Sequence, residues 1–112
     1  MALNENVEPL NDVKVRKAIQ MAIDRQTILD TVYNGDGSLV DGIYPKGLIG
    51  YTEDNEGWLK YDPEQAKSLL AEAGYADGFT MEIAADNSSS DSTLLVIQIV
   101  QQYLQQIGIN AE

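Results

Sequence analysis

The residues best suited to binding chemistry form one short polar segment, 86–92, which reads Asp-Asn-Ser-Ser-Ser-Asp-Ser. Its hydroxyl, amide and carboxylate groups can hydrogen-bond a small solute without filling the space that the solute needs. Two carboxylates in one segment favour a cationic group, such as a peptide amine, over an anion. The candidate ligand-binding residues are Asp86, Asn87, Ser88, Ser90, Asp91 and Ser92.

The same segment has a second, purely structural interpretation. Asp91 or Ser92 is also suited to cap a helix that begins there. A pair such as Asp86 and Asp91 would suit carboxylate-based hydrolysis, but nothing in the spacing supports an enzyme beyond the number of acids. Capping alone and ligand contact both stay open, and we expect no catalytic residues.

Composition excludes several other chemistries. The chain has no Cys and no His, which excludes disulfides, Cys- or His-based zinc sites and catalysis by either side chain. The acidic run at 53–56 does not match a calcium-binding EF-hand loop, because Thr52 and Pro63 would occupy the first and last ligand positions. We therefore expect no metal and no cofactor.

Charge and length narrow the class of protein further. Seven Lys and Arg against eighteen Asp and Glu in 112 residues give a net charge of −11. Such a chain repels phosphate backbones and anionic lipid, so nucleic acid is not an expected partner. The length allows one domain at most. No stretch reaches the roughly 20 apolar residues of a membrane span, and the first residues lack the layout of a secretory signal segment.

The polar segment lies between two predicted elements. Apolar residues alternate over 79–85, which predicts a strand, and 92–106 predicts a helix that Gly108 ends. A second strand is expected at 109–112. Strand, loop, helix and strand make a βαβ unit, which requires parallel pairing. In such units, ligands bind where a strand ends and the next helix begins, beside free backbone N–H groups.

Three further helices and one long loop precede this unit. Apolar spacing predicts helices at 13–23 and 25–33, and Asp62, Pro63 and Gln65 mark the start of a third at 63–73. Arg16 and Asp24 would lie on one helix face if the first helix is unbroken.

The connection at 34–61 is rich in Gly and aromatic residues. Tyr44, Tyr51, Trp58 and Tyr61 in it either pin the loop to its own domain or contact a ligand.

Five segments, taken in order, resemble a known family. Residues 9–25 look like a characteristic segment of the dipeptide/oligopeptide/nickel-binding family of extracellular solute-binding proteins of ABC importers. The glycine turn at 33–37, Gly-Tyr at 50–51, the block 61–75 and the segment 101–109 resemble later parts of the same family. Each match is weak alone, but the ordered set covers nearly the whole chain.

The resemblance implies a fold, a location and partners. The implied fold class is α/β, a fragment of the C-terminal lobe of a periplasmic-binding-protein-like clamp, with 1–112 as one partial domain. The parent protein would be periplasmic or a cell-surface lipoprotein, and it would capture a peptide-like solute for an ABC permease. The segment 86–92 would form one edge of its ligand pocket. The alternative is the ligand-sensing domain of a transcriptional regulator.

The exposed strand edge and the apolar face of helix 92–106 predict self-association of the chain.

Overall fold

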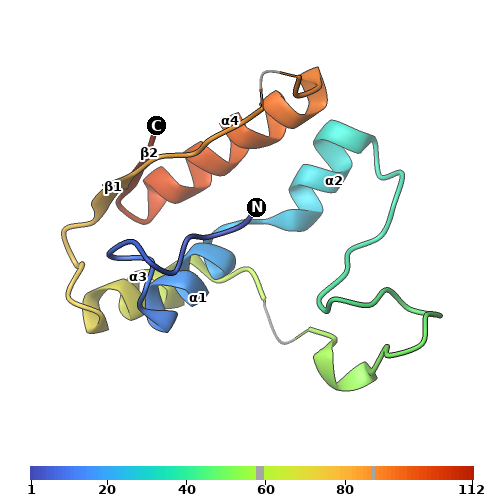
Figure 1. Cartoon of the computed structure of the whole chain (residues 1–112), viewed down its shortest axis with the longest axis horizontal. Helices are drawn as coiled ribbons and strands as arrows, with labels where there is room; N and C mark the ends of the chain where they lie inside the picture. Colours follow the sequence, from blue (N-terminus) through green and yellow to red (C-terminus); the bar gives the residue numbers. More distant parts are fainter. Residues whose placement is uncertain (58–59, 87) are drawn as a thin grey trace.

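The computed structural model describes residues 1–57, 60–86 and 88–112 (Figure 1). The elements in chain order are α1 (Val13–Ala22), α2 (Arg25–Tyr33), the 3₁₀ turn η1 (Glu53–Asn55), α3 (Pro63–Glu72), β1 (Phe79–Met81), α4 (Asp91–Gln106) and β2 (Ile109–Ala111). The two strands lie beside α4, α1 packs against α3, and the long loop between α2 and α3 extends to one side of the molecule (Figure 1). In the part of the chain that the structure describes, no helix is both long and apolar enough to cross a membrane.

The predicted βαβ unit is confirmed. β1 and β2 pair in parallel, with Phe79 opposite Ile109 and Met81 opposite Ala111, and α4 makes the crossover between them. The prediction of strands at 79–85 and 109–112 was too long at both carboxyl ends. Among the described residues β1 pairs with β2, and beyond Met81 the two segments are joined by the bond from Ile83 N to Glu112 O at 2.7 Å.

The core joins helices that are far apart in the sequence. Val15 and Ile19 on α1 are fully buried, as are Ala66 on α3 and Leu104 on α4. The 3.6-residue period of the apolar residues puts the buried side chains of α1 and of α3 on one face of each helix. Ile109 of β2 is also fully buried, so the core ties the βαβ unit to the α1–α3 pair.

α1 ends at Ala22, one residue before the predicted limit, because Ile23 is already extended (φ −99°, ψ 116°). Arg16 and Asp24 therefore do not share a helix face. Arg16 donates to the carbonyls of Leu10 and Asn11, both at 3.0 Å, and Asp24 caps α2 through Thr27 N at 3.1 Å. Each side chain fixes the start of a helix.

The observed ends of α2 and α3 differ from the predicted ends by at most one residue. α2 matches 25–33 and stops at Asn34, whose φ of +52° is left-handed. α3 ends at Glu72 rather than 73, and Gly74 follows with φ +90°, which suits a glycine that terminates a helix.

The long loop 34–61 contains one short element, η1, that the sequence did not predict. Its end is fixed to the body, because the ring of Tyr61 meets that of Tyr103 edge to face at 5.8 Å and Asp62 N donates to Met21 O at 2.8 Å. This supports the pinning interpretation for Tyr61. The prediction for Trp58 falls outside the described residues.

Candidate functional site

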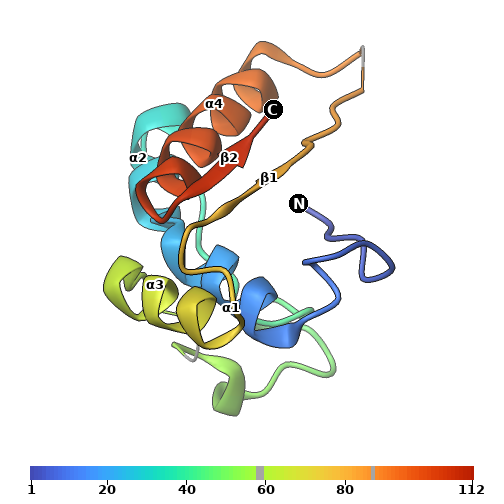
Figure 2. The same cartoon turned by 90° about the vertical axis from the view of Figure 1, so that its left-hand side faces the viewer.

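The polar segment lies where the sequence predicts, between the carboxyl end of β1 and the amino end of α4 (Figure 2). Asp86, Ser88, Ser90, Asp91 and Ser92 are all exposed, so their polar groups face solvent. Asn87 is outside the described residues. Five of the six predicted ligand residues are thus brought together at one end of the βαβ unit.

Asp86 organises the first half of this segment. Its Oδ1 accepts hydrogen bonds from the amide and the hydroxyl of Ser88, both at 2.7 Å, and its carbonyl accepts from Ser89 N at 2.9 Å. The Ser88 amide and then the Ser88 hydroxyl hold the pKa of Asp86 below its usual value, because both bonds stabilise the charged form. Asp86 therefore stays ionised and presents negative charge to solvent.

The cap of α4 is Ser90, so the prediction of Asp91 or Ser92 as the cap was wrong by one or two positions. Ser90 Oγ accepts from Thr93 N at 3.3 Å, and the two hydroxyls lie 3.0 Å apart. α4 accordingly begins at Asp91 rather than at 92. The carboxylate of Asp91 sits in the first turn, where the positive end of the helix dipole stabilises it. Capping explains Ser90 but leaves Asp91 and Ser92 without that structural role.

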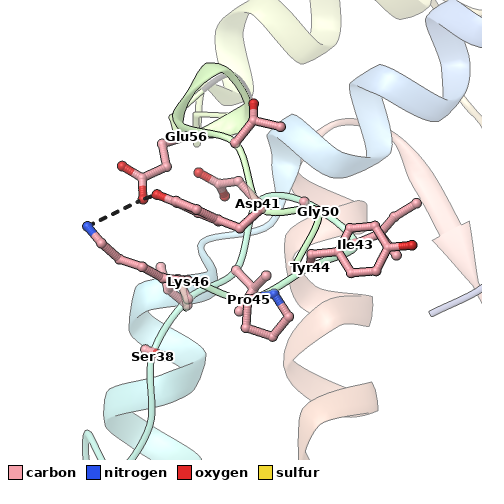
Figure 3. A pocket seen from close by; sticks show the side chains of 13 residues that line it. Ser38, Asp41, Ile43, Tyr44, Pro45, Lys46, Gly50 and Glu56 are labelled. Carbon is pink, nitrogen blue, oxygen red and sulfur yellow. Dashed lines mark hydrogen bonds and ion pairs between the residues drawn. The ribbon is translucent and has the colours of Figure 1, made fainter. Parts of the chain in front are cut away.

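A second candidate surface lies in the long loop between α2 and α3, around η1. A cavity of about 580 Å³ opens among the side chains of 38–56, with Tyr44, Pro45, Lys46 and Glu56 around it (Figure 3). The phenol of Tyr51 donates to Glu56, and the Lys46 ammonium lies 4.0 Å from the same carboxylate. The Glu56 bond raises the pKa of Tyr51 to about 12, since the nearby negative charge opposes ionisation of the phenol.

The base of this loop is closed by a contact between distant residues. Asp41 accepts from Arg25 Nη2 at 2.5 Å and from the Gly57 amide at 2.6 Å, and Arg25 also donates to Val40 O at 3.3 Å. The Gly57 amide first, then Arg25, holds the pKa of Asp41 below its usual value. Sequence reasoning missed this clasp, because the partners of Asp41 lie sixteen residues away on either side and no local pattern marks them.

Metal binding finds no geometric support in the part of the chain that the structure describes. Across 1–57, 60–86 and 88–112, no group of three or more acidic side chains converges on one point. The acids of 53–56 instead serve the turn and the Tyr51 contact.

The structure is of the α/β class, with two parallel strands joined through α4 and a polar loop at the carboxyl end of β1. The sequence matches the profile of the bacterial extracellular solute-binding proteins, family 5 (middle region), over residues 1–112. The chain belongs to this family.

Curated relatives agree with this assignment. The chain is 36% identical over 111 residues to the glutathione-binding protein GsiB of Salmonella choleraesuis, covering 99% of this chain and 21% of that protein. It is 31% identical over 115 residues to the dipeptide-binding protein of Escherichia coli, covering 100% of this chain and 21% of that protein. The chain therefore spans about a fifth of the length of these relatives.

A solved structure shows the same fold. A dipeptide-binding protein from a Pseudoalteromonas species, in complex with Met-Leu, superposes with a TM-score of 0.88 at 34% identity. The match covers 99% of this chain and 22% of that one. The predicted fold class, part of a periplasmic-binding-protein fold, is thus confirmed.

Proposed function

We propose that this chain is the first part of the C-terminal lobe of a solute-binding protein that captures a peptide-like solute outside the cytoplasmic membrane. The observation that carries the proposal is the match of all 112 residues to the family, with the polar loop placed at the carboxyl edge of the βαβ unit. The relatives named above bind glutathione or dipeptides, which supports a peptide-type ligand. The complete protein would deliver its solute to the membrane subunits of an ABC permease.

The ligand contacts on this chain are proposed to come from Asp86, Asn87, Ser88, Ser90, Asp91 and Ser92. Asp86 and Asp91 supply negative charge for the amine of a peptide, and the hydroxyls supply hydrogen bonds. Asp91 is the strongest candidate, because it is exposed at the helix end and Ser90 already provides the cap.

The mechanism follows from reversible binding without chemical conversion. Two lobes close around the solute by hinge motion, which buries it and presents a closed form to the permease. No bond of the solute is made or broken. The isolated chain, with about a fifth of the length of its relatives, is expected to bind the solute weakly or not at all.

A dipeptide panel tests the proposed class of ligand. Calorimetric titration of the full-length protein that carries this segment should show saturable binding of at least one dipeptide, such as Met-Leu, with an affinity in the micromolar range or tighter. Matched N-acetylated dipeptides should bind more weakly, because acetylation removes the cationic amine. A protein that binds none of the free peptides would contradict the proposal.

Self-association is proposed for the chain on its own. Leu94 and Leu95 on α4 are 46% and 42% exposed, and within the described residues the two strands pair only with each other. A sheet this small gains stability by adding strands. Light scattering should therefore show particles larger than a monomer as concentration rises, and a strict monomer would contradict the proposal.

A further inference from the structure

The end of α2 holds the one Asn-Gly pair in the sequence, Asn34–Gly35. Glycine has no Cβ, so no side chain shields the backbone nitrogen of Gly35. In an unfolded chain that nitrogen can attack Cγ, the amide carbon of the preceding asparagine. The pair can therefore undergo a spontaneous modification, and the fold determines whether the two atoms can meet.

The modification is a deamidation that needs only water as co-reactant. As Gly35 N bonds to Cγ of Asn34, the solvent takes the proton of that nitrogen. The bond from Cγ to Nδ2 breaks, and Nδ2 takes up a proton and leaves as ammonia. The product is a closed succinimide ring. Water then opens the ring at one of its carbonyls to give aspartate, or at the other to give isoaspartate, in which the backbone runs through Cγ.

The native conformation of Asn34 prevents this attack. Asn34 ends α2 in the left-handed region, with φ 52° and ψ 32°. At this ψ the nitrogen of Gly35 lies nearly opposite Cβ of Asn34 about the Cα–C bond, whereas ring closure needs both atoms on the same side. Gly35 N therefore cannot reach Cγ while the helix end keeps this conformation.

Three backbone hydrogen bonds hold this conformation in place. The N–H groups of Asn34 and Gly35 both donate to the carbonyl of Leu29, the second at 3.1 Å, and Asp36 N donates to Tyr33 O at 2.9 Å. The nitrogen that would attack is thus itself a donor at the helix end. All of these atoms belong to one short segment, so the conformation does not rest on contacts with distant parts of the protein.

We infer that Asn34 is a deamidation site that the left-handed end of α2 protects, and that modification occurs when this helix end opens. Local opening at a helix end costs less free energy than global unfolding. Asn adopts the left-handed conformation more readily than most residues, so the residue type that ends the helix well is also the one that can be modified. The inference is independent of the solute that the protein binds.

Formation of isoaspartate has a structural consequence at this point of the fold. The additional backbone carbon displaces the N–H of Gly35 from the carbonyl of Leu29, so the helix end cannot form again as before. The long loop 34–61 leaves α2 here (Figure 1). Deamidation therefore loosens the start of this loop, while the contact between Arg25 and Asp41 remains as its second attachment.

Peptide mapping by mass spectrometry measures the modification in the full-length protein that carries this segment, incubated at mildly alkaline pH. Asn34 should be converted at least about tenfold more slowly in the folded protein than in guanidinium chloride, because opening must break the bonds of the helix end. Asn11, which precedes Asp12, is the internal control and should change little in either state.

Each other outcome of this measurement contradicts the inference. Equal rates for Asn34 in the folded and the unfolded protein would overturn the protection. A folded protein that shows no conversion after the unfolded protein is fully converted would overturn the opening. An unfolded protein in which Asn34 changes no faster than Asn11 would overturn the site itself.

A matched pair of variants in the last turn of α2 separates opening from the chemistry of the pair. Thr31 is exposed, and its substitution leaves Asn34 and Gly35 in place. Thr31→Gly should speed conversion of Asn34 in the folded protein about threefold relative to Thr31→Ala, because Gly is a poorer helix former than Ala. In guanidinium chloride the two variants should be converted at the same rate. Equal rates in the two folded variants would show that opening of α2 does not control the site.

Discussion

Gly78 provides the sharpest test of how the βαβ unit is built. It precedes β1 with φ +77°, and a Cβ added there would meet the carbonyl oxygen of Gly108 at 1.8 Å and its carbon at 2.7 Å. Backbone atoms cannot rotate away as a side chain can. Gly78→Ala therefore forces the entrances of the two strands apart, at the point where Phe79 pairs with Ile109.

The expected loss of stability in Gly78→Ala combines two effects. A left-handed backbone costs an Ala about 1–2 kcal/mol relative to a right-handed one. Each ladder hydrogen bond lost at the strand entrance costs about 0.5–1.5 kcal/mol more, before any loss of packing around Ile109. Gly78→Ala should thus lower the free energy of unfolding by about 3 kcal/mol or more.

Two other glycines supply matched controls. Gly74 has φ +90° with nothing within 4 Å of an added Cβ, and Gly108 has φ +89° with its nearest contact at an ordinary 3.5 Å. Gly74→Ala and Gly108→Ala should each show only the backbone cost of about 1–2 kcal/mol. Urea unfolding followed by circular dichroism measures all three variants. If Gly78→Ala costs no more than Gly74→Ala, the close approach of the two strands is wrong.

Two further predictions concern the loops. Ser90→Ala should lower the free energy of unfolding by about 1 kcal/mol, because it removes the side chain that caps α4. Ser92→Ala is the control and should change the free energy of unfolding by less than about 0.5 kcal/mol. Equal effects of the two variants in urea unfolding would contradict the assignment of Ser90 as the cap. The pKa of Asp41 is lowered in the fold, so its clasp is fully present above the unfolded pKa of about 3.9 and is lost as pH falls through the lower folded value. NMR titration of the Gly57 amide should therefore show a transition below pH 4, roughly, and a transition at or above the unfolded value would contradict the clasp.

Helix positions were the most predictable part of the fold, because local chemistry determines them. Asp62 accepts from Gln65 N at 2.9 Å, Pro63 occupies the first turn of α3, and Gly74 follows its end. Each of these features acts within a few residues of its own position. The period of the apolar residues adds the buried face, and the structure confirms it at Ala66 and Leu70.

Strand length and loop closure were less predictable, because distant residues determine them. Apolar alternation continues past Met81, yet β1 covers only Phe79–Met81, and the pairing beyond it consists of the bond from Ile83 N to Glu112 O. Asp41 gains its role from Arg25 and Gly57, which only the folded loop brings together. The residues next to Asp41 in the sequence give no signal that predicts these contacts.

In the candidate site, the position of the polar segment was predictable from the sequence, but the residue that caps α4 was not. The segment 86–92 is found where the βαβ pattern predicts, but the choice of cap among its serines and aspartates was wrong. Every residue type in that run caps helices well, so propensity could not distinguish Ser90 from Asp91 or Ser92. The structure resolves this through the Thr93 contact and leaves Asp91 as the exposed carboxylate at the helix end.

Calorimetric titration of Met-Leu into Asp91→Asn full-length protein tests the central claim most directly. Gln102→Ala, an exposed change farther along the same helix, is the control. Loss of a charge-assisted hydrogen bond to the peptide amine should weaken binding by about tenfold or more, while the control retains the wild-type affinity. An unchanged dissociation constant for Asp91→Asn, together with unchanged values for Asn87→Ala and Ser92→Ala, would remove the polar loop from the ligand site.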